Sequence, residues 1–306
     1  MGVHITGWGS YLPEKVITND DLAEVMETSD EWIVERTGIS ERRVGATTTT
    51  MAIASGADAL ASAGVEPGDI DMLLVATTSA DQMMPSSAAS VQAALGLDCG
   101  AIDVNAACSG FVYALVQAAG MISLGYNKIL VIGADSLWTW TDHTDRGTAI
   151  LFADGGGAVV LEASDDETLL GFDLGCDGEG RHRLYTDHGE KIVMEGREIF
   201  RRAVRAMVTS SQAALDQAGL SPDDIDWMIP HQANLRIIES AGQKLGIEPE
   251  RTINVLQSTG NTSAASIPLA LVAGIESGRV KPGDMLLLTG FGAGMTWASA
   301  VIRWQP

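Results

Sequence analysis

Apolar residues in this chain gather in short runs that alternate with longer stretches of helical spacing. The short runs predict strands near residues 3–9, 72–78, 101–105, 128–134, 157–163, 168–175, 226–229, 252–255, 284–290 and 296–303. The longer stretches predict helices near residues 20–27, 51–63, 87–95, 109–124, 197–218, 234–245 and 262–277. Because strands alternate with helices along the whole chain, the pattern favours an α/β fold with parallel sheets.

Two of the predicted helices carry almost no charge. Residues 109–124 contain no Asp, Glu, Lys or Arg, and the stretch from Thr259 to Ile275 in the second helix is also uncharged. Surface helices of a chain with a formal net charge of −21 should carry charge, so we expect both helices to be buried between two sheets. This arrangement gives five layers, αβαβα, with one helix from each half in the middle.

The chain nearly repeats itself at half its length. Residues 63–74 read AGVEPGDIDMLL and residues 218–229 read AGLSPDDIDWMI, with six of twelve positions identical. An internal repeat indicates that one supersecondary unit was built twice and packed against itself. We place the boundary near residues 162–168, which predicts an N-terminal half, 1–165, and a C-terminal half, 166–306.

Composition excludes several classes of protein. The net charge of −21 argues against binding to nucleic acid or to an anionic membrane surface. Residues 104–127 are apolar enough to suggest a membrane span, but Asn105 and Gln117 interrupt them, so a protein-buried helix is the better interpretation. The chain opens directly into a strand-like segment rather than a signal peptide, and we expect a cytoplasmic protein.

The three cysteines are Cys99, Cys108 and Cys176, an odd number without CxxC spacing. This pattern disfavours a disulfide framework or a zinc site and fits a reducing compartment. Cys108 stands at a strand-to-helix junction, where the free N–H groups of the helix should stabilise a thiolate and lower the thiol pKa. From spacing alone, Cys108 is either a nucleophile or a small buried apolar side chain.

Three further positions could carry chemistry. His231 directly follows a predicted strand, and ligands gather at the carboxyl ends of strands in open α/β sheets. Asn261 enters the second uncharged helix, where Asn is also a good N-cap, but the repeat places it opposite Cys108 across a pseudo-twofold axis. Residues 290–294, GFGAG, could bring backbone N–H groups close to a developing oxyanion. His231 and Asn261 each keep a purely structural interpretation at this point.

Seven segments then occur in order over essentially the whole chain. They are TSDEWIVERTGISER (28–42), VATTSA (75–80), AACSGF (106–111), TDRGT (144–148), DWMIPHQANLRII (226–238), STGNTSAAS (258–266) and GFGAGMTW (290–297). Together they resemble the β-ketoacyl-acyl-carrier-protein synthase III family, the initiating condensing enzymes of bacterial fatty-acid synthesis. The resemblance implies a thiolase-like, five-layered α/β fold and a homodimer.

The resemblance also implies roles for the candidate residues. Cys108 would be the nucleophile that accepts an acyl group from acyl-coenzyme A (acyl-CoA). His231 and Asn261 would assist decarboxylation of malonyl-acyl carrier protein and stabilise the enolate. The N–H groups of Cys108 and Ala293 would form the oxyanion hole. No metal and no cofactor is implied, since acyl-CoA is a substrate.

Binding surfaces follow from the same resemblance. The residues matched to coenzyme A binding are Thr28, Trp32, Arg36, Arg146 and Asn234. The expected docking surface for the acidic carrier protein is basic, with Arg201, Arg202, Arg205, Arg236 and Lys244 joined by Arg197, although ordinary surface arginines would look the same. Met84 and Phe291 are expected in the acyl pocket, Met84 across the dimer interface.

Two departures from the family bear on specificity. Many acetyl-using relatives have Phe where this chain has Met84, and Met is flexible, so we expect primers longer than acetyl. The segments near 45–51 and 176–193 look shorter than usual.

Two other functions remain open from sequence. One is a polyketide starter synthase or a ketosynthase-like acyltransferase of similar fold. The other is a non-catalytic ketosynthase-like partner, which the retention of Cys108, His231 and Asn261 argues against.

Overall fold

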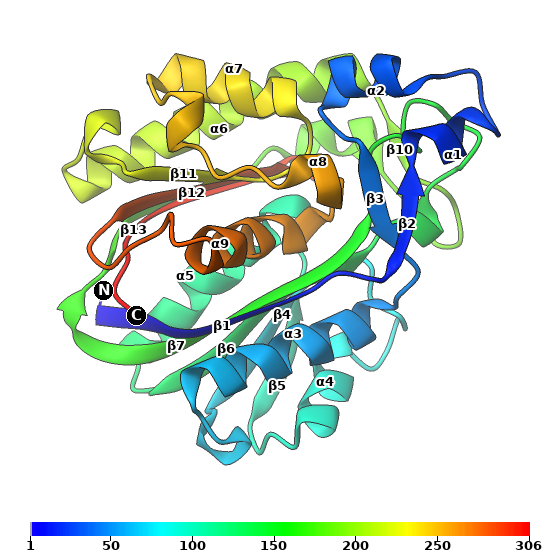
Figure 1. The fold of residues 1–306 in the computed structure, drawn as a ribbon. Coiled ribbons are helices and arrows are strands. Elements are labelled where there is room, and N and C mark those ends of the chain that lie inside the picture. Colours follow the sequence, from blue (N-terminus) through cyan, green and yellow to red (C-terminus); the bar gives the residue numbers. More distant parts are fainter. Residues whose placement is uncertain (1) are drawn as a thin grey trace.

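The computed structural model describes residues 2–306 and contains two main sheets (Figure 1). The first has the strand order β1 (Gly2–Tyr11), β7 (Asp154–Glu167), β6 (Lys128–Ser136), β4 (Met72–Ala76) and β5 (Gly100–Val104). The second has the order β11 (Trp227–Pro230), β12 (Met285–Gly292), β13 (Thr296–Arg303) and β8 (Leu169–Cys176). Only the pairs β4–β5, β4–β6 and β11–β12 are parallel, so both sheets are mixed and not parallel as expected.

The five-layer arrangement is confirmed. Helices α5 (Gly110–Ser123) and α9 (Ser266–Glu276) lie between the sheets (Figure 1). Helices α3 (Thr48–Ala63) and α4 (Ser87–Leu95) cover the outer face of the first sheet, and α6 (Gly196–Ala218) and α7 (Leu235–Leu245) cover the second. The lack of charge in α5 and α9 follows from this position, since side chains such as Phe111 and Ile267 are fully buried against both sheets.

Smaller elements complete the fold. They are the hairpins β2 (Lys15–Thr18)–β3 (Glu41–Val44) and β9 (Leu184–Tyr185)–β10 (Val193–Met194), the helices α1 (Asn19–Ala23), α2 (Asp30–Thr37) and α8 (Leu256–Thr259), and the 3-10 turns η1 (Pro67–Asp69), η2 (Ala107–Ser109), η3 (Trp138–Trp140), η4 (Gly178–Arg183), η5 (Pro222–Asp224), η6 (Pro249–Arg251) and η7 (Ser263–Ala265). The pattern predicted one longer helix near 20–27 and missed α2. Ser29 caps α2 at its start, and Gly38 ends it with φ of 76°.

The two buried helices begin in the same way. Ala107, before α5, has φ of 47°, and Ser263, before α9, has φ of 52°. The side-chain Oδ1 of Asn105 accepts a hydrogen bond from the Ala107 N–H at 3.3 Å, and that of Asn261 accepts one from the Ser263 N–H at 2.9 Å. The repeat therefore builds two matching tight turns, and one of them carries Cys108.

The strand predicted at 252–255 is wrong. Only Thr252 forms a bridge, with Met228, beyond which the backbone turns away. The N–H of Val255 donates to the side-chain Oε1 of Gln232 at 3.0 Å instead of to a neighbouring strand. A side chain thus replaces the ladder hydrogen bond that a strand would have made.

The chain passes from the first sheet to the second at Thr168, between β7 and β8. We keep the division into halves 1–165 and 166–306 as a proposal that this crossing supports. Within the described residues, no helix has the length and apolar character needed to cross a membrane.

Candidate active site

Two cavities meet at Cys108. The larger one, about 1020 Å³, is also lined by His231 and Asn261, so side chains from both halves face the same space. The smaller one, about 490 Å³, is also lined by Cys108 and includes Ala293 and Ser263. A thiol at the junction of two cavities can react with a molecule that extends into both.

The Cys108 turn is held by the β12–β13 hairpin. Gly292 packs so closely that a Cβ there would lie 2.6 Å from the Cys108 backbone nitrogen. The Thr296 hydroxyl oxygen lies 2.7 Å from the carbonyl oxygen of Ala106 and 3.0 Å from that of Ala293, and its one proton is shared between these two acceptors. Thr296 thus fixes the Ala293 loop beside the nucleophile, a role that sequence reasoning missed.

The pKa of Cys108 moves in the direction opposite to our expectation. The pKa of the thiol is raised to about 12, mainly by burial and to a smaller extent by the negative charge of Asp135, while the Ser263 side chain and the Cys108 backbone N–H act against the rise. Desolvation of the thiolate outweighs stabilisation by the helix start. Cys108 is therefore a protonated thiol at neutral pH in the free protein.

His231 is held by a hydroxyl of α9. It follows β11 and is buried, and its Nδ1 lies 2.6 Å from the Ser266 hydroxyl. That hydroxyl also accepts the Gln232 backbone N–H at 3.2 Å. We assign the hydroxyl proton to the contact with Nδ1, which places the ring proton of a neutral His231 on Nε2. Burial lowers the pKa of His231 to about 3, which keeps the ring neutral and makes Nε2–H a donor.

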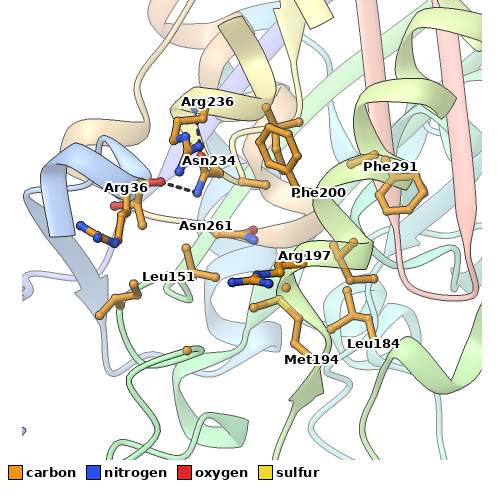
Figure 2. Close-up of a pocket in the computed structure, with 18 of the residues that line it drawn as sticks. Arg36, Leu151, Leu184, Met194, Arg197, Phe200, Asn234, Arg236, Asn261 and Phe291 are labelled. Carbon is orange, nitrogen blue, oxygen red and sulfur yellow. Dashed lines mark hydrogen bonds between the residues drawn. The ribbon is translucent and has the colours of Figure 1, made fainter. Parts of the chain in front are cut away.

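Both the backbone and the side-chain oxygen of Asn261 are fixed by hydrogen bonds. Its backbone is paired with the chain of the other half, because its N–H donates to Leu151 at 2.9 Å and its carbonyl accepts from Ala153 at 2.9 Å. Since Oδ1 is used by the Ser263 N–H, the side-chain NH₂ is left as a donor for the cavity that Asn261 lines. Figure 2 shows Asn261 among the residues that surround this space.

Three of the five residues predicted to bind coenzyme A line the larger cavity, namely Trp32, Arg36 and Asn234. The guanidinium groups of Arg36 and Arg146 lie 4.3 and 4.4 Å from the centre of the Trp32 ring. Asn234 caps α7 and donates to the Arg36 carbonyl at 2.9 Å (Figure 2). Thr28 is not among the residues described as lining this cavity.

Only some of the basic residues predicted to bind the carrier protein lie at the larger cavity. Arg197, Arg201 and Arg236 line the larger cavity. Arg201 also forms an ion pair with Glu198. Arg202 forms ion pairs with both Glu198 and Asp177, each at 2.8 Å, so its charge is largely compensated within the fold. The remaining two basic residues, Arg205 and Lys244, are not found at this cavity in the described chain, and Lys244 lies in the last turn of α7, far from Arg236 at its start.

The two residues expected in the acyl pocket, Met84 and Phe291, lie in different surroundings. Phe291 is buried against α6 and lines the larger cavity. Met84 is 85% exposed, and within this single chain it is not among the residues described at either cavity. The apolar wall of the smaller cavity comes from residues that sequence reasoning missed, namely Leu137, Trp140, Phe152, Leu184 and Ile192.

The fold and the arrangement of Cys108, His231 and Asn261 define a thiolase-fold condensing acyltransferase. Comparison with known proteins makes the family specific. Residues 102–178 match the model for 3-oxoacyl-[acyl-carrier-protein (ACP)] synthase III, and residues 215–304 match the model for its C-terminal part. The chain belongs to this family.

Individual relatives agree over the full length. The chain is 50% identical to a β-ketoacyl-[acyl-carrier-protein] synthase III of Geobacillus kaustophilus, with 99% of each chain covered. The solved 3-oxoacyl-[acyl-carrier-protein] synthase III of Aquifex aeolicus has a TM-score of 0.96 and 43% identity, covering 99% of this chain and 100% of that one. The priming β-ketosynthase of the R1128 polyketide pathway has a TM-score of 0.95 at 34% identity, covering 99% and 96%.

Proposed function

We propose that this chain joins an acyl group from acyl-CoA to malonyl-acyl carrier protein, through an acyl-enzyme on Cys108, and so initiates fatty-acid synthesis. The observation that carries the proposal is the meeting of Cys108, His231 and Asn261 at one cavity that continues past the sulfur. Membership in the synthase III family supports it, and the higher identity to fatty-acid synthases III favours it over a polyketide starter function.

The first half-reaction acylates Cys108. The sulfur attacks the thioester carbonyl of acyl-CoA, the new S–C bond forms, and the coenzyme leaves with the proton that Cys108 loses. The backbone N–H groups of Cys108 and Ala293 are the proposed donors to the oxyanion. We assign the larger cavity to the coenzyme, because Trp32 and several arginines line or flank it, and the smaller cavity to the acyl chain.

The second half-reaction condenses and decarboxylates. Malonyl-carrier protein loses CO₂, and the electron pair of the broken C–C bond forms an enolate whose oxygen accepts from His231 Nε2–H and the Asn261 NH₂. The enolate carbon attacks the acyl carbonyl on Cys108, and collapse of the adduct releases 3-oxoacyl-carrier protein and a thiolate, which takes up a proton. Two neutral donors suit this step, because an enolate gains from fixed dipoles in a dry site.

We also propose that the protein is a homodimer and that it works in the cytoplasm. Strand β5 is an edge strand of its sheet and leaves Ile102 44% exposed, and Met83 and Met84 are both 85% exposed. Apolar residues on an exposed edge are typical of an interface. The three free cysteines fit a reducing compartment, and the proposed chemistry requires no cofactor.

Intact-mass measurement tests the proposal. Incubation with a panel of acyl-CoA thioesters should add one acyl group per chain, and malonyl-carrier protein should then remove it as a 3-oxoacyl product. Cys108→Ser should abolish the adduct, because the hydroxyl has no adjacent base matched to its high pKa. Stoichiometric acylation of this variant would refute Cys108 as the nucleophile.

A further inference from the structure

A buried carboxylate lies close to the nucleophile and has no part in the proposed reaction. Asp135, near the end of β6, is fully buried. Five groups donate hydrogen bonds to it, at distances of 2.8–3.1 Å: the hydroxyls of Thr77 and Ser79 and the backbone N–H groups of Thr78, Ser79 and Ala264. Because every one of these groups donates, the set fits the ionised, acceptor-only form of the carboxyl group.

Asp135 joins the two halves of the molecule at the active site. Its Oδ1 holds the loop after β4, while its Oδ2 holds the Ala264 N–H in η7 of the other half. The backbones approach closely here, since a Cβ on Gly133 would lie 2.4 Å from the Ala264 carbonyl oxygen. Asp135 therefore fixes the turn that carries both Asn261 and Ser263.

Ser263 lines the smaller cavity together with Cys108, and the next residue, Ala264, donates its backbone N–H to Asp135. The Ser263 hydroxyl is fully buried and has no hydrogen-bond partner among the described residues. Burial raises the pKa of both the Cys108 thiol and the Asp135 carboxyl group, and the Ser263 side chain acts against this rise in each case. A buried hydroxyl without a partner costs free energy, which suggests that its partner forms during the reaction.

We propose that the Ser263 hydroxyl, which has no hydrogen-bond partner among the described residues of the free protein, is a positioning group that donates to the Cys108 sulfur when the thiolate forms. The inference rests on the proposed function, for which it names a further residue. Ser263 keeps its own proton throughout, and only the direction of its O–H changes. Once Cys108 is acylated the sulfur has lost its charge, and this hydrogen bond is released.

Other charged or titratable groups also face Cys108. Asp135 reaches it from β6 and His231 from the loop after β11. The wall of the larger cavity adds Arg36, Arg197, Arg201 and Arg236, and that of the smaller cavity adds Tyr185, Asp187, His188, Glu190 and Lys191. Of these groups, Asp135 is the one whose negative charge raises the pKa of the Cys108 thiol. Removing the hydroxyl and removing this charge should therefore have opposite effects on the thiolate.

Alkylation of Cys108 by iodoacetamide across a pH series, followed by peptide mass spectrometry, separates these effects. Site resolution is needed because Cys99 and Cys176 also react. Ser263→Ala and Ser263→Gly should slow alkylation of Cys108 about tenfold near neutral pH, since a hydrogen bond to a charged group is lost. Glycine adopts the positive φ of this position readily, so agreement between the two variants excludes backbone strain as the cause. Asp135→Asn should speed the reaction.

The matched control is Thr262→Val. Thr262 has a buried hydroxyl without a partner in the same turn, but its side chain packs against Gly155 instead of Cys108. The rate of Cys108 alkylation in this variant should equal that in the unmodified protein. The proposal is overturned if both Ser263 variants are also alkylated at the unmodified rate. This outcome does not depend on whether Asp135→Asn folds. Because alkylation needs no acyl-CoA, this result is independent of whether the proposed function holds.

Discussion

At the scale of single residues, burial determines which chemistry the site can perform. It makes the Cys108 thiol hard to ionise and keeps His231 neutral, with pKa values of about 12 and about 3. A thiolate–imidazolium pair is therefore not the resting state of this site. Neutral donors remain, and each is fixed by a hydroxyl or a backbone contact, as Ser266 fixes His231.

The depressed pKa of His231 predicts a dependence of stability on pH. Below the unfolded-state value of 6.5 the unfolded chain binds a proton that the folded protein does not, so stability falls as the pH falls from 6.5 toward 3. The loss should be about 2 kcal/mol at pH 5 relative to pH 8. Urea unfolding of the unmodified protein and of His231→Asn measures it, because the variant should lack this contribution.

The matched control is His182→Asn, which changes an exposed ring in η4. Asp135 and Asp154 have raised pKa values and stabilise the fold as pH falls, so only the difference between variants isolates His231. If the free energy of unfolding depends on pH equally in His231→Asn and in the unmodified protein, the lowered pKa of His231 is not the cause.

Ser266 offers a second test at this scale. Ser266→Ala removes the hydroxyl that contacts His231 Nδ1 and that, in the assigned tautomer, keeps the ring proton on Nε2. Decarboxylation of malonyl-carrier protein should fall about tenfold to a hundredfold, because an enolate donor is no longer oriented, while acylation of Cys108 should be unchanged. Ser277→Ala, at the other end of α9, is the control. Equal losses in both half-reactions would indicate a purely structural role for Ser266.

At the scale of elements, the sequence predicted most helices and strands because their apolar spacing is strong. The prediction of a strand failed where a side chain takes the hydrogen bond that a neighbouring strand would otherwise make. The side chain of Gln232 does this in the segment 252–255. The Cys108, His231 and Asn261 positions followed from motifs, but their supporting groups did not. Ser266 lies inside a recognised motif, yet its contact with His231 depends on how α9 packs beside β11, which spacing along the chain does not reveal.

The third prediction concerns two arginines at the larger cavity, Arg201 in α6 and Arg236 in α7. Arg201→Glu and Arg236→Glu should raise the KM for malonyl-carrier protein, with an effect that shrinks as salt rises, because exposed steering charges are screened. Arg201 also lines the cavity assigned to the coenzyme, so the KM for acyl-CoA is measured in parallel, and the rise for the carrier protein should be the larger of the two. Arg202→Glu should instead lower thermal stability, since it sets three carboxylates together with Glu198 and Asp177.

Lys281→Glu makes the same change of charge at an exposed site before β12 and should leave the KM unchanged. If it raises the KM as much as Arg201→Glu does, only net charge matters. If instead neither variant alters carrier-protein kinetics at low salt, the docking surface lies elsewhere.

At the scale of the whole molecule, the site spans both halves and is open on one side. Asn261 reaches Cys108 from the second half, and Asp135 joins the two halves beneath it. The smaller cavity has an apolar wall, and the exposed Met84 is the expected remaining part of it, supplied by a second copy of the chain. Primer choice is then a property of the dimer rather than of one chain.

A mixed dimer tests this prediction. One chain carries Cys108→Ser together with Met84→Phe, and the other is unmodified, so the only reactive Cys108 belongs to the unmodified chain. If Met84 acts across the interface, that Cys108 should prefer acetyl-CoA over branched or longer acyl-CoA, because a rigid ring from the partner narrows its cavity. Competition between thioesters, read by intact mass, measures the preference. A mixed dimer of Cys108→Ser with the unmodified chain is the control, and an identical preference in the two dimers would show that Met84 does not reach the partner's site.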